Sequence, residues 1–215
     1  KTFTENGKIF NTLDDMYPAL VLLHLFEDTH DEKYITVAKQ IVSTLREYPR
    51  TKGGGFLHMV RHDGQLWLDG LYMINVFLAK YGEITNDPSY YDEVAKQISV
   101  YTDLLRDNET GLLYHAYVEG NSQKNFHSES KHSNEFWSRS LGWVMMAIVE
   151  VLNIMPEDYK GRKEIIKRLK SLTDALLQFQ DSETGLWYQV TNRADLERNW
   201  LESSSTAMFT YSMAK

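Results

Sequence analysis

The octapeptide Asp107-Asn108-Glu109-Thr110-Gly111-Leu112-Leu113-Tyr114 recurs as Asp181-Ser182-Glu183-Thr184-Gly185-Leu186-Trp187-Tyr188. A weaker copy, Gly54-Gly55-Phe56-Leu57-His58, follows an earlier apolar segment. Each copy comes after a stretch in which apolar residues recur every three or four positions, and this spacing predicts an amphipathic helix. Units that repeat a helix, a glycine turn and an aromatic loop bury their apolar faces by stacking on one another. The octapeptide therefore predicts an all-α array of helical hairpins, either a solenoid or a closed α/α toroid.

The apolar spacing predicts seven helices, and no strand alternation extends beyond short loop segments. The helices with aromatic and polar residues mixed at their beginnings are expected to be inner ones, whereas the Lys/Glu-rich helices are expected to be solvated outer ones. In a toroid the loop residues His58, His115 and Gln189 would surround a central funnel at one end. The expected helix ranges are 14–28, 32–48, 66–81, 88–106, 135–154, 162–180 and 203–213.

The composition excludes several classes of protein. The 215 residues are 42% hydrophobic and 25% charged, as in ordinary globular domains. A formal charge of -7 argues against nucleic-acid binding, and no apolar run is long enough to span a membrane. The absence of cysteine excludes disulfides and thiolate metal sites. The first residues do not resemble a signal peptide, so we expect a cytoplasmic location, or a periplasmic one if a signal peptide has been removed.

Several motifs, taken in order, resemble the unsaturated rhamnogalacturonyl hydrolases of glycoside hydrolase family 105. The motifs are Pro49-Arg50-Thr51, Gly54-Gly55-Phe56-Leu57-His58, Gln65-Leu66-Trp67-Leu68-Asp69-Gly70-Leu71-Tyr72-Met73, Tyr114-His115-Ala116-Tyr117, Phe136-Trp137-Ser138-Arg139-Ser140-Leu141-Gly142-Trp143 and Asn199-Trp200-Leu201-Glu202-Ser203-Ser204. The resemblance implies an (α/α)6 barrel. It also implies a bacterial glycoside hydrolase that removes a 4,5-unsaturated uronic acid from the non-reducing end of short pectin-derived oligosaccharides.

The reaction implied by the resemblance is hydration of a double bond. An acid protonates C4, water adds at C5, and the resulting hemiketal rearranges so that the glycosidic bond breaks. By motif position Asp69 matches the family's general acid and base. Neighbouring aromatic rings would raise the pKa of Asp69 by desolvation, so that it carries the proton. The structural alternative is an N-cap, in which an ionised Asp69 accepts hydrogen bonds from free helix amides.

A second catalytic carboxylate is expected on an earlier inner helix, where Asp14 and Asp15 are adjacent. Asp14 aligns better with the family. It is expected either to orient the sugar or to influence the protonation of Asp69 through its like charge. Ordinary N-capping is the alternative for both residues, and the sequence leaves the choice between them open.

Five residues are expected to bind the substrate because of their positions in the motifs. An imidazole donates hydrogen bonds to a uronate, and a guanidinium binds a carboxylate at two places. The tryptophans would stack on sugar rings, with core packing as their alternative role. The five residues are His58, His115, Trp137, Arg139 and Trp143. No metal or cofactor is expected, and no role is assigned to His62, His127 or His132.

The helix count departs from the family pattern, because the family barrel has twelve helices and seven are predicted here. Residues 1–215 are therefore expected to form a single α/α-barrel catalytic domain that is truncated at both ends. One alternative function is that of an unsaturated glucuronyl hydrolase acting on another lyase product. The other is a noncatalytic helical-repeat protein that binds glycan or protein, in which Asp69, His115 and Arg139 need not converge. The sugar linkage, sulfation and oligomeric state do not follow from the sequence.

Overall fold

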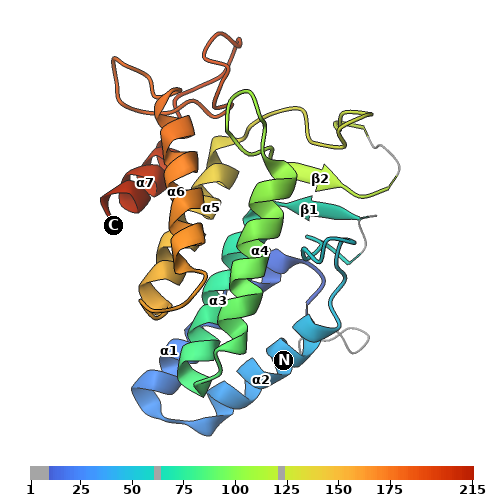
Figure 1. Cartoon of the computed structure of the whole chain (residues 1–215), viewed down its shortest axis with the longest axis vertical. Helices are drawn as coiled ribbons and strands as arrows, with labels where there is room; N and C mark the ends of the chain where they lie inside the picture. The colour runs from blue at the N-terminus through green and yellow to red at the C-terminus, as the bar shows by residue number, and fades with distance from the viewer. Residues whose placement is uncertain (1–9, 61–63, 121–123) are drawn as a thin grey trace.

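The computed structural model describes residues 10–60, 64–120 and 124–215 (Figure 1). Within these ranges the chain forms a 3-10 helix, seven α-helices and two short strands. The strands β1 (Gln65–Trp67) and β2 (Ala116–Val118) pair antiparallel, with Leu66 opposite Tyr117. The helices are η1 (Leu13–Met16), α1 (Ala19–Thr29), α2 (Glu32–Arg46), α3 (Asp69–Thr85), α4 (Ser89–Leu105), α5 (Ser138–Ile154), α6 (Arg162–Leu177) and α7 (Ser203–Ala214).

Three predicted helix beginnings are wrong by a few residues, each for an identifiable reason. The first predicted helix is divided into η1 and α1, because Pro18 lacks the amide hydrogen needed to continue the helical ladder, and it stands at the position immediately before α1. The helix predicted from residue 66 begins at Asp69, because residues 65–67 form β1. The helix predicted from residue 135 begins at Ser138, because Trp137 pairs as an isolated bridge with Val190.

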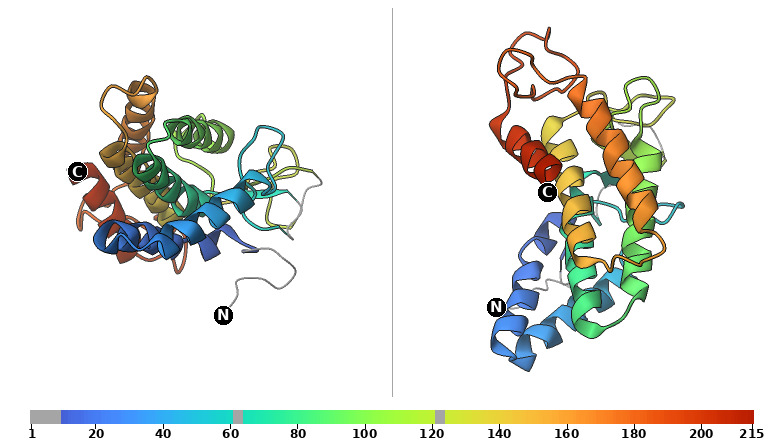
Figure 2. Two further views of the ribbon diagram at one scale, coloured as in Figure 1. Left: turned by 90° about the horizontal axis from the view of Figure 1, so that it is seen from below. Right: turned by 60° about the vertical axis from the view of Figure 1, so that its left-hand side comes forward.

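The helices form two layers of successive hairpins. The inner helices α1, α3, α5 and α7 pack against one another in chain order. The outer helices α2, α4 and α6 each pack on the inner helix that precedes them. Figure 2 shows the hairpins following one another from blue to orange. Among the helices of the described ranges, none combines the length and apolar composition needed to cross a membrane.

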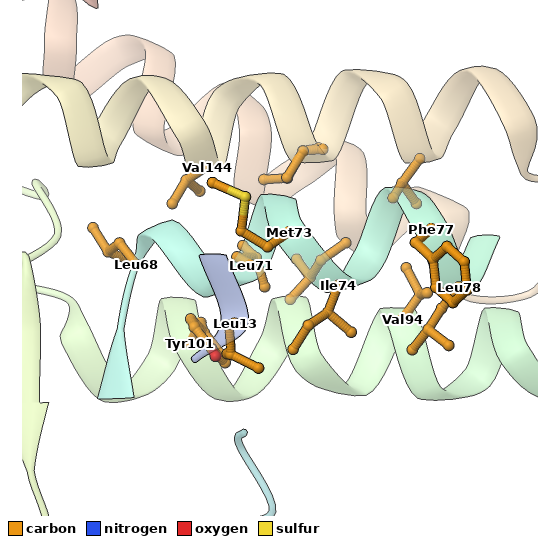
Figure 3. Close-up of a cluster of buried hydrophobic side chains, with 14 of the residues drawn as sticks. Leu13, Leu68, Leu71, Met73, Ile74, Phe77, Leu78, Val94, Tyr101 and Val144 are labelled. Atoms are coloured by element: carbon orange, nitrogen blue, oxygen red, sulfur yellow. The ribbon is translucent and has the colours of Figure 1, made fainter. Parts of the chain in front are cut away.

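The hydrophobic core is centred on α3, which lies between α4 and α5 in Figure 3. Ile74 and Leu78 point toward α4, where Val94 lies next to Leu78, while Met73 points toward Val144 of α5. These side chains are at most 9% exposed. Burying an aliphatic side chain of this size contributes about 1.5–3 kcal/mol. This packing holds the beginnings of the inner helices in a fixed relation to one another.

The two octapeptide copies fold in the same way. The Oδ2 of Asp107 accepts hydrogen bonds from the Thr110 amide and hydroxyl at 2.8 and 2.6 Å. Asp181 receives the same two bonds from Thr184, at 3.1 and 2.7 Å. The following glycines, Gly111 and Gly185, have φ of 74° and 72°, a conformation that favours glycine. The sequence repeat is therefore a structural repeat that places two aromatic loops equivalently, after α4 and after α6.

Candidate active site

Each repeat loop is hydrogen-bonded to the beginning of the preceding inner helix. The carbonyl oxygens of His58, His115 and Gln189 accept hydrogen bonds, each at 2.9 Å, from the amides of Leu13, Leu68 and Ser138 respectively. The residue after each donor is therefore also structurally equivalent. These first-turn residues are Asp14, Asp69 and Arg139. The three loop residues and the three first-turn residues thus belong to one repeated arrangement.

Gly70 allows the η1 segment to pack closely on the beginning of α3. A Cβ atom at Gly70 would lie 2.6 Å from Leu13 Cδ1 and 3.1 Å from the Tyr101 hydroxyl. The same position would be 3.8 Å from His58 Nδ1. Only a residue without a side chain lets these groups approach. The Asp-Gly pair in the motif therefore combines a carboxylate with the space needed for the neighbouring repeat.

The first acid–imidazole pair consists of Asp14 and His58. The Oδ2 of Asp14 lies 3.5 Å from His58 Nε2. His58 is fully buried and stacks on Trp67, with ring centres 4.3 Å apart and planes 8° apart. Hydrogen bonding to His58 lowers the pKa of Asp14, although partial burial opposes this shift. Asp14, whose side chain is 56% exposed, therefore remains ionised at neutral pH.

Asp15 contacts backbone amides, whereas Asp14 lies beside an imidazole. The Oδ2 of Asp15 accepts hydrogen bonds from the Asn11 and Thr12 amides, each at 3.2 Å. These bonds form a capping box with Thr12 at the beginning of η1. The geometry therefore favours a capping role for Asp15 and leaves Asp14 as the carboxylate next to an imidazole.

The second acid–imidazole pair consists of Asp69 and His115. Asp69 Oδ2 lies 3.4 Å from His115 Nδ1, and the two atoms are not aligned for a hydrogen bond. The Asp69 side chain is only 13% exposed, and no side chain caps α3. Burial raises the pKa of Asp69 to about 6. Its own backbone amide and the positive charges of His58 and Arg139 oppose this rise, whereas the charge of Asp14 adds to it.

His115 is held neutral over most of the pH range. Burial lowers its pKa to about 4, and the charge of His58 acts in the same direction. Between about pH 4 and pH 6, a protonated carboxyl therefore faces a neutral imidazole, and above about pH 6 a carboxylate faces the same neutral ring. Despite the 3.4 Å separation the two groups are not an ion pair near neutrality, because burial disfavours charge on both. Asp69 can consequently both hold and release a proton near pH 6.

Aromatic rings enclose His115 on two sides. Its ring centre lies 5.3 Å from that of Trp67 and 5.1 Å from that of Trp137, the latter in an edge-on contact of 88°. The guanidinium carbon of Arg139 lies 5.1 Å from the Trp137 ring centre, within the range of a cation–π contact. Asp69, His115, Trp137 and Arg139 therefore form one continuous series of contacts.

Trp143 lies one turn further along α5 and belongs to a separate aromatic cluster. Its ring centre is 5.0 Å from Tyr72 and 6.2 Å from Tyr17. Tyr17 is 55% exposed, so the cluster reaches solvent. Sequence reasoning did not select either tyrosine, although Tyr72 stands only three residues after Asp69 on the same helix. A spacing of three residues places Asp69 and Tyr72 on the same face of the helix, so the sequence contained a signal that Tyr72 lies near the candidate acid.

Other polar and aromatic residues contribute to the structure of the loops. His132 Nε2 lies 2.8 Å from the Leu104 carbonyl oxygen, and its ring stacks on Tyr114. Trp187 is buried and donates from Nε1 to the Leu176 carbonyl at 2.8 Å, so it covers the core. His62 lies outside the described residues. Within the described ranges, no three His, Asp or Glu side chains gather as a metal-ligand set.

Comparisons with known proteins show the family and the fold of the chain. The model of Glycosyl Hydrolase Family 88 matches residues 1–215. A solved glycoside hydrolase of family 105 from C. acetobutylicum ATCC 824 superposes with a TM-score of 0.90 at 35% identity, covering 94% of this chain and 56% of that protein. The chain thus shares the helical-hairpin fold expected from the repeat.

Two sequence relatives carry functional names. The unsaturated rhamnogalacturonyl hydrolase YesR of Bacillus subtilis is 27% identical over 192 residues, which is 86% of this chain and 53% of YesR. An unsaturated 3S-rhamnoglycuronyl hydrolase of Formosa agariphila is 32% identical over 123 residues, which is 56% of this chain and 32% of that enzyme. The chain spans about half the length of YesR and of the clostridial hydrolase.

Proposed function

The chain belongs to Glycosyl Hydrolase Family 88, and we propose that it removes a 4,5-unsaturated uronic acid from the non-reducing end of rhamnogalacturonan-derived oligosaccharides. The observation that carries this proposal is the buried Asp69 carboxyl, whose pKa is raised to about 6 beside the neutral imidazole of His115. A group that titrates there is able to give up and take back a proton near neutral pH.

Asp69 performs both proton transfers of the proposed reaction. The protonated carboxyl donates to C4 of the sugar, and the electrons of the C4=C5 bond form the new C–H bond. The cation at C5 is stabilised by the ring oxygen. Water then adds at C5 and returns a proton to Asp69. The resulting hemiketal opens to a ketone, and the released C1 hemiacetal expels the remaining oligosaccharide.

The surrounding side chains bind and orient the sugar. Arg139 binds the uronate carboxylate in this proposal, and the 39% exposure of its side chain supports this role. Trp137 presents its ring beside both Arg139 and His115, so it is suited to packing on a sugar face. Trp143 would extend this aromatic surface through its contact with Tyr72. His58 is completely buried, so we assign its influence on the reaction to its contact with Asp14.

A related substrate class is the second candidate. The similarity to the unsaturated 3S-rhamnoglycuronyl hydrolase of Formosa agariphila supports an unsaturated uronate from another lyase product as an alternative substrate. A noncatalytic role as a binding protein is disfavoured, because Asp69, His115, Trp137 and Arg139 lie in one series of contacts. We also propose that residues 1–215 belong to one α/α-barrel catalytic domain, since the fold matches that of the clostridial hydrolase.

The test is a turnover assay with the full-length chain. The unsaturated rhamnogalacturonan disaccharide loses its ultraviolet absorbance when C4=C5 is hydrated, and defined unsaturated disaccharides from other lyases serve as competing substrates. We expect the rhamnogalacturonan product to be preferred and Asp69→Asn to lose turnover. Asp158→Asn, at an exposed carboxylate between α5 and α6, is the matched control and should behave as wild type. Near wild-type absorbance decay with Asp69→Asn would refute the assignment.

A further inference from the structure

We infer that Glu202, acting together with Ser204, is a positioning residue for Arg139. The inference rests on the proposed function, because it assigns Arg139 to the uronate carboxylate. Glu202 belongs to the Asn199–Ser204 motif, which by itself assigns no chemistry to this residue. The structure connects it to Arg139 by a defined set of contacts at the beginning of α7.

The contacts form a short relay from α5 to α7. Arg139 Nη1 donates to the Ser204 hydroxyl oxygen at 3.3 Å. That hydroxyl donates to Glu202 Oε1 at 2.7 Å. Arg139 Nη2 lies 3.9 Å from the same Oε1 atom. One oxygen of Glu202 therefore acts on Arg139 both directly, through charge, and through Ser204.

The other oxygen of Glu202 has a separate task. Oε2 accepts a hydrogen bond from the Ser205 amide, so Glu202 also caps α7. Its side chain is only 8% exposed. Burial raises its pKa, but hydrogen bonds from Ser205 and Ser204 and the charge of Arg139 outweigh this and keep the pKa below its ordinary value. The two oxygens thus divide capping and positioning between them.

The repeat explains why these residues meet. Glu202 immediately precedes α7 as Trp137 immediately precedes α5. Ser204 stands two residues after Glu202, and Arg139 stands two residues after Trp137. Ser204 is therefore the first-turn counterpart of Arg139 on the next inner helix, and adjacent first turns of neighbouring inner helices bring the two side chains together.

This arrangement reduces the freedom of a long side chain. A free arginine samples many rotamers, and fixing it on binding opposes association. The Trp137 ring contacts one part of the guanidinium, while Ser204 and Glu202 contact its Nη atoms. With 39% of the side chain exposed, the guanidinium remains accessible to a ligand carboxylate. Glu202 and Ser204 thereby hold Arg139 ready to bind.

The test is a double-mutant cycle read as affinity for D-galacturonate, a uronate probe, by titration calorimetry on the full-length chain. Binding is independent of turnover, so failure of the proposed reaction and failure of this inference give different results. We expect Glu202→Gln to weaken binding about tenfold, a typical coupling for groups in one network. Glutamine keeps an oxygen for the α7 cap. In an Arg139→Ala background the same change should alter affinity by less than about twofold.

Two further variants keep the result interpretable. Ser204→Ala should weaken binding in the same Arg139-dependent way, and it leaves the cap intact. Glu197→Gln, at a carboxylate 91% exposed in the preceding loop, is the control that should leave affinity unchanged. Equal losses from Glu202→Gln with and without Arg139 would show that Glu202 only stabilises α7. Failure of the wild-type chain to bind galacturonate would also overturn the inference.

Discussion

The Asp14–His58 and Asp69–His115 pairs occupy the same position in two successive repeats, yet the pKa values of their carboxyls are shifted in opposite directions. The closest oxygen–nitrogen distances are 3.5 and 3.4 Å. In the first pair the imidazole is fully buried and the acid is 56% exposed; in the second the acid is only 13% exposed. In the Asp14–His58 pair it is mainly the imidazole that is buried, whereas in the Asp69–His115 pair both the carboxyl and the imidazole are largely buried.

The difference shows how a repeated backbone supports two kinds of carboxylate. Asp14 has a lowered pKa and remains ionised, whereas the pKa of Asp69 is raised to about 6. Desolvation disfavours the charged form, and a hydrogen bond to the charged form favours it. The repeat thus supplies the geometry, while hydrogen bonding to His58 lowers the pKa of Asp14 and burial raises the pKa of Asp69.

The largest expected effect separates the two acids by rate. We predict that Asp69→Asn lowers kcat by roughly 10³-fold or more, since proton transfer is lost. Asp14→Asn should lower it by about tenfold, because it removes a neighbouring charge and leaves the proton donor in place. Steady-state kinetics on the unsaturated disaccharide measures both. Equal losses of kcat in the two variants would contradict the proposal that Asp69 is the proton donor and Asp14 is not.

A second effect concerns the pH profile. The activity kcat/KM should fall above about pH 6, roughly tenfold per pH unit, because ionised Asp69 has no proton to donate. The charge of Asp14 helps to raise the pKa of Asp69, so Asp14→Asn should move the falling limb to lower pH. Initial rates between pH 4 and pH 9 measure the limb. If kcat/KM falls at the same pH in Asp14→Asn as in the wild type, the two acids do not interact.

Stability should respond to pH in opposite ways at the two sites. A raised folded-state pKa contributes stability that is complete below pH 3.8 and is lost as pH rises through about 6. Asp69→Asn has no carboxyl to titrate at this position, so it does not lose this stability as the pH rises. Between pH 4 and pH 8 the free energy of unfolding of the variant should therefore rise by about 2 kcal/mol relative to that of the wild type. Urea unfolding at the two pH values measures the gain.

For Asp14 the sign is reversed. Its lowered pKa contributes stability above pH 3.8 that is lost as pH falls through the folded-state pKa. The loss in stability caused by Asp14→Asn should therefore shrink on acidification. The same urea series provides this comparison, and parallel pH dependences for both variants would contradict it.

The smallest expected effect compares the two octapeptide loops. Both Gly111 and Gly185 have positive φ, so alanine at either position should cost about 1 kcal/mol of unfolding free energy. Gly111→Ala should cost more, because its Cβ would lie 3.1 Å from Ala175 Cβ, whereas the closest contact at Gly185 is 3.7 Å. Gly111→Ala should also reduce kcat, since this loop leads to His115. Denaturant unfolding and kinetics of both variants test the ranking.

Much of the fold was predictable because its signals are local. Helical spacing and the repeated octapeptide predicted the seven helices and the hairpin array. The motifs predicted a glycoside hydrolase of family 105, which the family 88 match and the similarity to solved family 105 hydrolases support. The helix beginnings near residues 66 and 135 were wrong, because Leu66 pairs with Tyr117 and Trp137 with Val190. Such pairings between distant segments leave no trace in local periodicity.

Part of the geometry of the candidate site was predictable from the repeat. The repeat indicated that His58, His115 and Gln189 are equivalent, and their backbone hydrogen bonds agree. The choice between Asp14 and Asp15 depends on which way adjacent side chains point on one turn of η1. The link from Ser204 to Arg139 depends on the packing of α7 beside α5. The catalytic and binding roles themselves remain predictions.

The most direct test of the account is a carboxyl ¹³C NMR titration of the full-length chain, with Asp14→Asn and Asp69→Asn used to assign the two resonances. We predict that the Asp69 carboxyl titrates with a midpoint of about 6, and that the Asp14 carboxyl titrates below its ordinary value of 3.8. Titration of both carboxyls near 3.8 would contradict the claim that burial gives two equivalent acids different roles.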